Sequence, residues 1–247
     1  MTEPLFFAFY ASELQQAYSL WIVPLLFLAY LLSAGRRRAT ASTDPAAGFL
    51  WTYALVFTVE PLLDSFSTSL LAKWLGIAGT SVGTAWMVAF VLLGDWRVFV
   101  LVLRLARPRS RWLRDATLWT LLVPLVALDV ASDLRRRWPE LPEQTIWLVY
   151  ELLFLAVAVV LRALLVPRWT AREAPERAPF LRAALGYVAA YYGLWALSDV
   201  LVMVFDLDAG WALRVVPNQL YYSFWVPFVF WLFFREPARR SVASAAS

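Results

Sequence analysis

Long apolar runs, separated by short polar connections, recur along the whole chain. Each run has the roughly 18 to 25 residues that a helix needs to cross about 30 Å of hydrocarbon. No stretch between them is long enough for a separate soluble domain. We therefore expect an all-α polytopic membrane protein, with one seven-transmembrane-helix bundle over residues 1–240 and a short disordered tail at 241–247. The predicted spans are 17–35, 47–70, 81–104, 115–134, 145–166, 180–205 and 212–234.

Arginines concentrate in alternate connections between these spans. The connections after the first, third and fifth spans and the segment after the seventh hold three, five, four and three arginines. The opposite side of the membrane is left with Lys73, Arg135, Arg136, Arg137 and Arg214. Because cytoplasmic loops carry the excess of positive charge, the pattern predicts a multi-pass protein of the cell membrane with the N-terminus outside and the C-terminus inside.

Composition narrows the possible chemistry. The chain is 62% hydrophobic and contains neither cysteine nor histidine, which excludes disulfides, thiol chemistry and imidazole ligands for zinc or haem. The net charge of +4 arises from arginines at span ends, so we expect no nucleic-acid partner. The first sixteen residues either form a short interfacial helix or begin the first span.

Acidic residues occur inside the predicted spans, which is unusual for helices in lipid. At 1.5 Å per residue, the predicted topology places these acids in the outer halves of four different spans. A charge at the centre of a bilayer costs about 2.5–3.5 kcal/mol on insertion scales, so such residues face the bundle interior. The sequence therefore predicts one buried polar site that contains Glu60, Asp64, Asp129, Glu151 and Asp199.

Few basic residues are predicted at the same depth. Arg97 and Asp95 fall in the inner half of the third span, where we expect either a separate internal ion pair or an arginine that extends to the lipid head groups. The outer acids should then lack cationic partners, and desolvated carboxyl groups that repel one another retain a proton near neutral pH. That is the condition for a general acid. A structural alternative is that hydrogen bonds from these acids hold helices together.

Aromatic and amide side chains surround the predicted acidic site. Bulky rings hold helices apart, can line a pocket, and can stabilise a cation through their π faces, although ordinary packing explains aromatic residues equally well. We expect these groups to bind a lipophilic small molecule. The predicted substrate-binding residues are Asp129, Glu151, Asn218, Gln219, Tyr222, Trp195 and Trp225.

The predicted catalytic residues are Glu60, Asp64 and Asp199, with Glu60 as the essential acid. Buried carboxylic acids beside aromatic walls suit proton-initiated chemistry on a lipophilic isoprenoid or lipid, without a cofactor. A magnesium site is a further possibility, because Asp129 and Asp133 lie one helical turn apart. No metal site is predicted beyond it.

The length, the seven spans and Glu60 within "FTVEPLLDSF" of the second span resemble the small membrane-bound terpene cyclases of meroterpenoid and indole-terpenoid pathways. In that family the span-two glutamate and an aspartate of the last span are the proposed acid pair. The last span here carries Asn218 and Gln219 instead, so the resemblance implies that Asp199 takes the second role. It implies an isomerase or lyase that cyclises an isoprenoid.

Two other function classes fit the same sequence. Carboxylates on several helices, with prolines inside spans, would also serve a proton- or cation-coupled transporter. A seven-helix chain with an outer N-terminus would also suit a ligand-binding sensor. The oligomeric state is left open.

Overall fold

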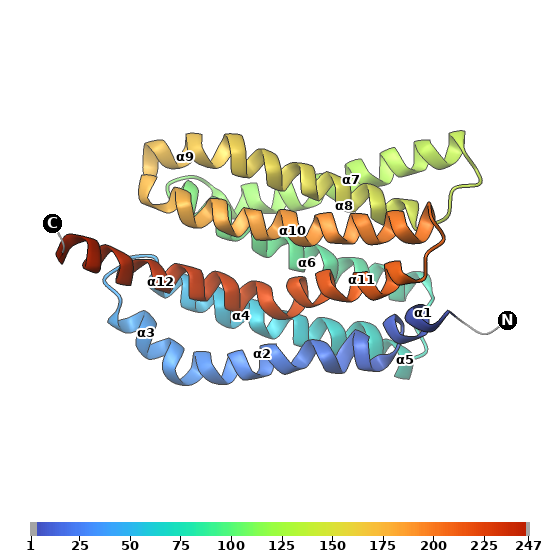
Figure 1. Cartoon of the computed structure of the whole chain (residues 1–247), viewed down its shortest axis with the longest axis horizontal. Helices are drawn as coiled ribbons and strands as arrows, with labels where there is room; N and C mark the ends of the chain where they lie inside the picture. Colours follow the sequence, from blue (N-terminus) through green and yellow to red (C-terminus); the bar gives the residue numbers. More distant parts are fainter. Residues whose placement is uncertain (1–3, 246–247) are drawn as a thin grey trace.

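The protein is an elongated bundle of antiparallel helices. The computed structural model describes residues 4–245, with side chains as far as residue 235, and all regular structure in this part of the chain is helical. The two ends of the chain lie at opposite ends of the bundle (Figure 1). Among the residues that the structure describes, six helices are long and apolar enough to cross a membrane. They are Leu14–Ala41 (containing α2, Ser19–Tyr30, and α3, Arg36–Ala41), Ala47–Trp74 (α4, Ala47–Ser65, and α5, Ala72–Trp74), Ser81–Ala106 (α6), Trp112–Arg137 (α7), Thr145–Glu173 (α8, Thr145–Val160, and α9, Val166–Glu173) and Pro175–Met203 (containing α10, Ala178–Met203).

A further long helix follows these six. It consists of α11 (Ala209–Asn218), a π-helical segment (Gln219–Phe224) and α12 (Trp225–Ala245). Polar residues in its first half lower its hydropathy relative to the other six, although its position agrees with the predicted seventh span. The tail predicted from residue 241 overlaps the end of α12, and residues 246–247 lie outside the described part of the chain.

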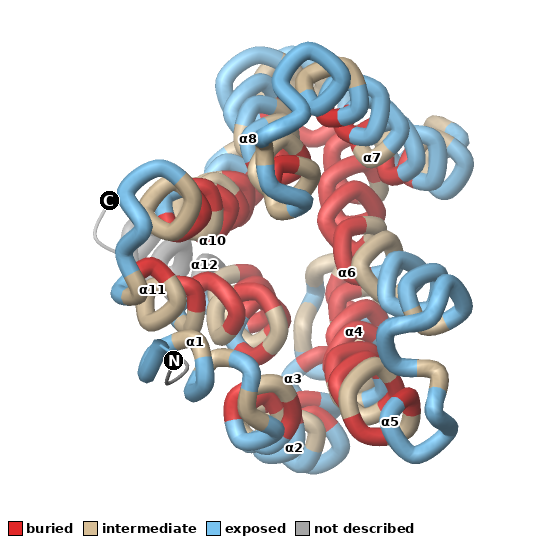
Figure 2. Tube along the Cα trace, turned by 90° about the vertical axis from the view of Figure 1, so that its right-hand side faces the viewer, coloured by how far each residue is buried: buried red, intermediate tan, exposed pale blue. Residues whose placement is uncertain are grey.

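The pattern of exposure suits a lipid environment. Large apolar side chains such as Ile22, Leu26 and Leu125 are more than 60% exposed, which would be costly in water but is expected at a lipid-facing surface. Helix α6 packs against α7 and α4, and its buried part is drawn in red between them (Figure 2). Its last nine residues, Val98 to Ala106, are apolar and buried on nearly every side except at Arg104. The bundle is therefore closely packed at the end where α6 finishes.

Two elements lie at the periphery. Helix α7 packs against α6 and α8 and leaves its remaining surface exposed (Figure 2). The short helix α1 (Leu5–Tyr10) lies against α11, where the Asp208 carboxylate accepts hydrogen bonds from the backbone N–H groups of Phe6 and Phe7 at 2.9 and 3.1 Å. Of the two possibilities for the N-terminal residues, the separate short helix is therefore confirmed for residues 5–10.

Candidate functional site

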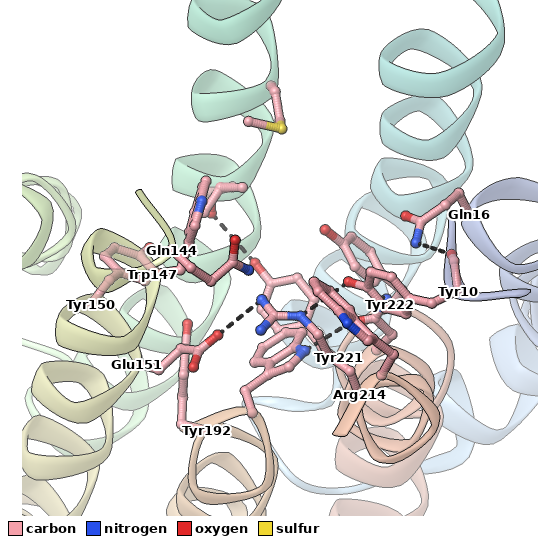
Figure 3. Close-up of a pocket in the computed structure, with 15 residues that line it drawn as sticks. Tyr10, Gln16, Gln144, Trp147, Tyr150, Glu151, Tyr192, Arg214, Tyr221 and Tyr222 are labelled. Carbon is pink, nitrogen blue, oxygen red and sulfur yellow. Dashed lines mark hydrogen bonds and ion pairs between the residues drawn. The ribbon is translucent and has the colours of Figure 1, made fainter. Parts of the chain in front are cut away.

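A cavity of about 290 Å³ lies at the end of the bundle that carries α1 (Figure 3). Residues from α1, α6, α8, α10 and α11 line it, together with residues of the segments next to them. Eight of the lining side chains are aromatic, and five of these are tyrosines. The polar lining consists of Gln16, Gln144, Glu151, Arg214 and Asn218, besides the tyrosine hydroxyls.

Arg214 organises the charged wall of this cavity. Its guanidinium forms an ion pair with Glu151, at 3.2 Å between Nη2 and Oε1, and a second ion pair with Asp199. Its Nε donates a hydrogen bond to the Tyr10 hydroxyl at 3.2 Å, and the Asn218 amide lies 3.5 Å from the same hydroxyl. We refer to Tyr10, Glu151, Asp199, Arg214 and Asn218 as the Arg214 cluster. The cluster joins α1, α8, α10 and α11 around one guanidinium. Figure 3 labels three of its members, Tyr10, Glu151 and Arg214.

A glycine one turn before Arg214 brings it close to α10. A Cβ atom at Gly210 would lie 2.8 Å from the backbone oxygen of Ser198 and 2.6 Å from a Val202 methyl group. Only glycine permits this approach of α11 to α10. Arg214 lies four residues further along the same helix face, so the close approach positions its guanidinium beside Asp199.

Asp95 lies directly behind the aromatic wall of the cavity. It accepts hydrogen bonds from Tyr150, Tyr192 and Tyr221, the last at 3.2 Å, and it is fully buried. All three tyrosines also line the cavity. Gly94 makes room for this arrangement, because a Cβ atom there would lie 2.0 Å from the Tyr221 hydroxyl oxygen. Three phenols therefore separate a buried carboxylate from the cavity space.

A second guanidinium, that of Arg97, lies deeper and is also fully buried. It forms an ion pair with Glu60 at 3.2 Å and donates to the backbone carbonyl of Tyr221 at 2.7 Å. It also lies 4.2 Å from the centre of the Tyr221 ring. We refer to Glu60, Asp64, Asp95 and Arg97 as the Arg97 cluster. The Tyr221 carbonyl lies in the π-helical segment, where the altered helical hydrogen bonding leaves carbonyls available to side chains.

These contacts correct the prediction that the acids lack cationic partners. Glu60 is paired with Arg97, and both Glu151 and Asp199 are paired with Arg214. Arg97 was expected to pair with Asp95 in a separate inner group, but it lies at the depth of Glu60. Counting residues from uncertain span boundaries therefore gave Arg97 the wrong depth relative to Glu60.

The described part of the chain nevertheless buries more carboxylates than guanidiniums. Its buried acidic residues are Glu60, Asp64, Asp95, Glu151 and Asp199, whereas its buried basic residues are Arg97 and Arg214. Some carboxylate oxygens there also lack a hydrogen-bond partner among the described residues, namely Glu60 Oε1, Glu151 Oε2 and Asp199 Oδ2. An ionised carboxylate cannot remain unbalanced at such a depth, so the three excess groups require protons or a bound cation.

The predicted site residues differ in whether they line the cavity. Glu151, Trp195, Asn218 and Tyr222 line the cavity, and Trp195 donates to the Asn218 side-chain oxygen at 2.8 Å. Asp199 contacts Arg214 but does not line the cavity.

Glu60 and Asp64 are buried nearby, but neither lines the cavity. Gln219 donates to Ser19 at 2.9 Å, and Trp225 donates to the Tyr53 hydroxyl at 2.9 Å, so both are used in contacts between helices instead. Neither Gln219 nor Trp225 lines this cavity.

The placement of Asp129 was wrong. Its side chain is exposed on α7, whose buried positions include Val123, Ala127 and Ala131 on the opposite face. Asp133 pairs instead with Arg137 at 2.8 Å. Among the described residues, no group of three or more histidine, cysteine or acidic side chains is arranged to hold a metal ion.

Sequence reasoning missed the residues that organise the cavity. Arg214 was counted only as a topology charge, and Tyr10 was not assigned to the site. The four-residue spacing of Arg214 and Asn218 is a signal that was present, because it puts both on one helix face. Gln144, by contrast, begins α8 after a loop and has no periodic pattern that could have identified it.

Comparisons with protein-family models, with curated protein sequences and with solved structures found no match to this chain. Its function is therefore inferred from the geometry of the cavity and the two clusters.

Proposed function

We propose that the protein is an enzyme of the cell membrane that carries out acid–base chemistry on a lipophilic substrate bound in the aromatic cavity. The observation that carries this proposal is the excess of three buried carboxylates over buried guanidiniums beside that cavity. Protons held by such carboxylic acids are available for transfer to a substrate. Eight aromatic side chains around the cavity would stabilise a cation formed there.

Glu151 takes the role of the acid in this proposal, in place of Glu60. It lines the cavity, and its Oε2 atom has no hydrogen-bond partner among the described residues, while Oε1 is held by Arg214. An acid must reach the atom that it protonates, and Glu60 lies outside the cavity lining. Arg214 and Asp199 act as positioning residues that hold the Glu151 carboxyl in place.

Proton-initiated cyclisation of an isoprenoid alkene or epoxide fits this arrangement. The Glu151 proton would form a bond to the substrate, and the resulting cation would close a ring by accepting electrons from a second double bond. Loss of a proton back to the Glu151 carboxylate completes an isomerisation without a cofactor. The product has the mass of the substrate.

A proton-coupled carrier is the second candidate, since the same three excess carboxylates could load and release protons. The packing of the bundle favours an enzyme with access from one end. Beyond the Arg97 cluster, α6 continues as a buried apolar helix from Val98 to Leu103. A carrier would have to open this region to complete a transport cycle.

The test uses membranes that contain the wild type or Glu151→Gln, incubated with linear and epoxidised prenylated substrates. We expect a new isomer of unchanged mass from the wild type, and a loss of at least a hundredfold in its rate of formation in Glu151→Gln. Asp129→Asn makes the same acid-to-amide change on an exposed face and should keep full activity. Equal activity of Glu151→Gln would refute the acid role. Proton flux into liposomes without any product would favour the carrier.

We also infer that the helix of α11 and α12 is a seventh span and that the N-terminus lies outside. The native chain has no cysteine, so single cysteines report topology without background. A membrane-impermeant maleimide applied to intact cells should label Ala78→Cys but not Thr43→Cys, and both should react after lysis. The reverse pattern would invert the topology, and labelling of both would contradict it.

A further inference from the structure

A second hollow, a groove of about 940 Å³, lies between α6, α7 and the start of α8. Small side chains of α7, Ala127 and Ala131, are buried at its base. Val88 of α6 and Leu128 of α7 also line it and remain 38% and 48% exposed. Because these helices are apolar enough to cross a membrane, the groove is open to the lipid.

The groove has the length and polarity of one lipid leaflet. On α7 it extends from Pro124 to Arg135 and Arg136. The eleven residue steps from Pro124 to Arg135 correspond to roughly 16 Å, about half of a hydrocarbon core of about 30 Å. The deep part is lined mainly by apolar residues, whereas the end near the membrane surface carries both arginines together with Glu143, whose side chain is 94% exposed. A phospholipid in the leaflet on the α1 side likewise has a polar head group at the membrane surface and apolar chains beneath it.

The two arginines are available to a ligand. Arg135 and Arg136 lie 4.0 Å from Glu143 and Asp133, the limit of an ion pair, and their side chains are 44% and 76% exposed. The neighbouring Arg137, which does not line the groove, is held by Asp133 at 2.8 Å. Two weakly paired guanidiniums above an apolar groove match an anionic head group above a hydrocarbon chain.

The groove shares a wall with the aromatic cavity. Met87, Val91, Gln144, Trp147 and Tyr150 line both spaces. A lipid acyl chain lying in the groove would therefore contact the same side chains that enclose the cavity.

We propose that this groove is a binding site for one anionic phospholipid of the leaflet next to α1, with its phosphate at Arg135 and Arg136 and an acyl chain over Ala127 and Ala131. The site is separate from the proposed reaction and holds its lipid whatever chemistry the cavity performs. Lipid tails are as apolar as the groove, so burial of the chain gives little preference over the bulk bilayer. Selectivity for the lipid comes from the two guanidiniums.

Native mass spectrometry of the detergent-purified protein tests this site, with phosphatidylglycerol and phosphatidylcholine of identical chains as probes. We expect the wild type to retain phosphatidylglycerol in preference to phosphatidylcholine. Arg135→Gln and Arg136→Gln should each reduce this preference roughly fivefold. Arg137→Gln removes the same charge outside the groove and should leave the preference unchanged.

The part of the groove that is proposed to hold the acyl chain is tested by filling it with a large side chain. Val88→Trp should reduce the retention of both lipids, and Leu125→Trp, on a lipid-exposed position outside the groove, should not. If Val88→Trp fails to fold, Leu128→Trp makes the same test from the opposite wall. Three results would overturn the proposal: no preference in the wild type, an equal loss in Arg137→Gln, or unchanged retention in the groove-filling variant.

Discussion

Removal of the Arg97 side chain should strongly destabilise the bundle, and removal of Glu60 as well should restore part of the loss. Arg97 and Glu60 are both almost completely buried, at 0% and 4% exposure, and 3.2 Å separates their charged atoms. Arg97→Met leaves Glu60, Asp64 and Asp95 in the Arg97 cluster without a cation. Glu60→Gln leaves Arg97 with its bond to the Tyr221 carbonyl.

The magnitudes follow from this geometry. Two unit charges at 3.2 Å attract by about 5 kcal/mol at an effective dielectric constant near 20. Stranding one partner of such a buried pair costs about 3–5 kcal/mol, so we expect that loss in the free energy of unfolding for Arg97→Met. Glu60→Gln should cost about 1–3 kcal/mol, because the arginine keeps other partners. The double variant should recover at least about 1 kcal/mol relative to Arg97→Met, since Glu60 is no longer stranded.

Unfolding in dodecyl maltoside micelles with increasing fractions of dodecyl sulfate, followed by tryptophan fluorescence, measures these values. Lys73→Met is the matched control, because Lys73 and Glu13 form a closer ion pair at 2.6 Å on an exposed surface. We expect no measurable change in that control, since exposed pairs contribute little. Additive losses in the double variant would show that Arg97 and Glu60 are not energetically coupled, and the argument for a buried pair would fail.

Three further substitutions test the positions of single residues. Gly94→Ala would place a Cβ atom 2.0 Å from the Tyr221 hydroxyl oxygen. This should force the hydroxyl away from Asp95 and lower the midpoint of the same unfolding transition, and an unchanged midpoint would contradict the close approach. Gly210→Ala should separate α11 from α10 and reduce substrate turnover through displacement of Arg214, whereas wild-type turnover in a stable variant would argue against this positioning role. Asp129→Asn should change neither stability nor turnover, and a large loss in either would restore this exposed residue to the site.

The class of structure and part of the cavity lining were determined by the sequence alone. Apolar run length predicted seven spans, and the described residues contain six helices that are long and apolar enough to cross a membrane. This signal is local, because the energetic penalty for polar groups in lipid restricts each segment independently of its neighbours. The same penalty identified Glu60, Glu151 and Asp199 as inward-facing, and all three are buried.

Only the tertiary structure decided which acids pair with which arginines and which residues line the cavity. Whether an acid contacts a guanidinium depends on the rotation and depth of two different helices, and residue counting fixes neither. For this reason Arg214 was assigned to topology although it holds Glu151, and Asp129 was placed inside although α7 turns it outward. The close approach at Gly94 joins α6 to Tyr221, far along the chain, and the close approach at Gly210 joins α11 to the last turns of α10; residue spacing predicts neither contact.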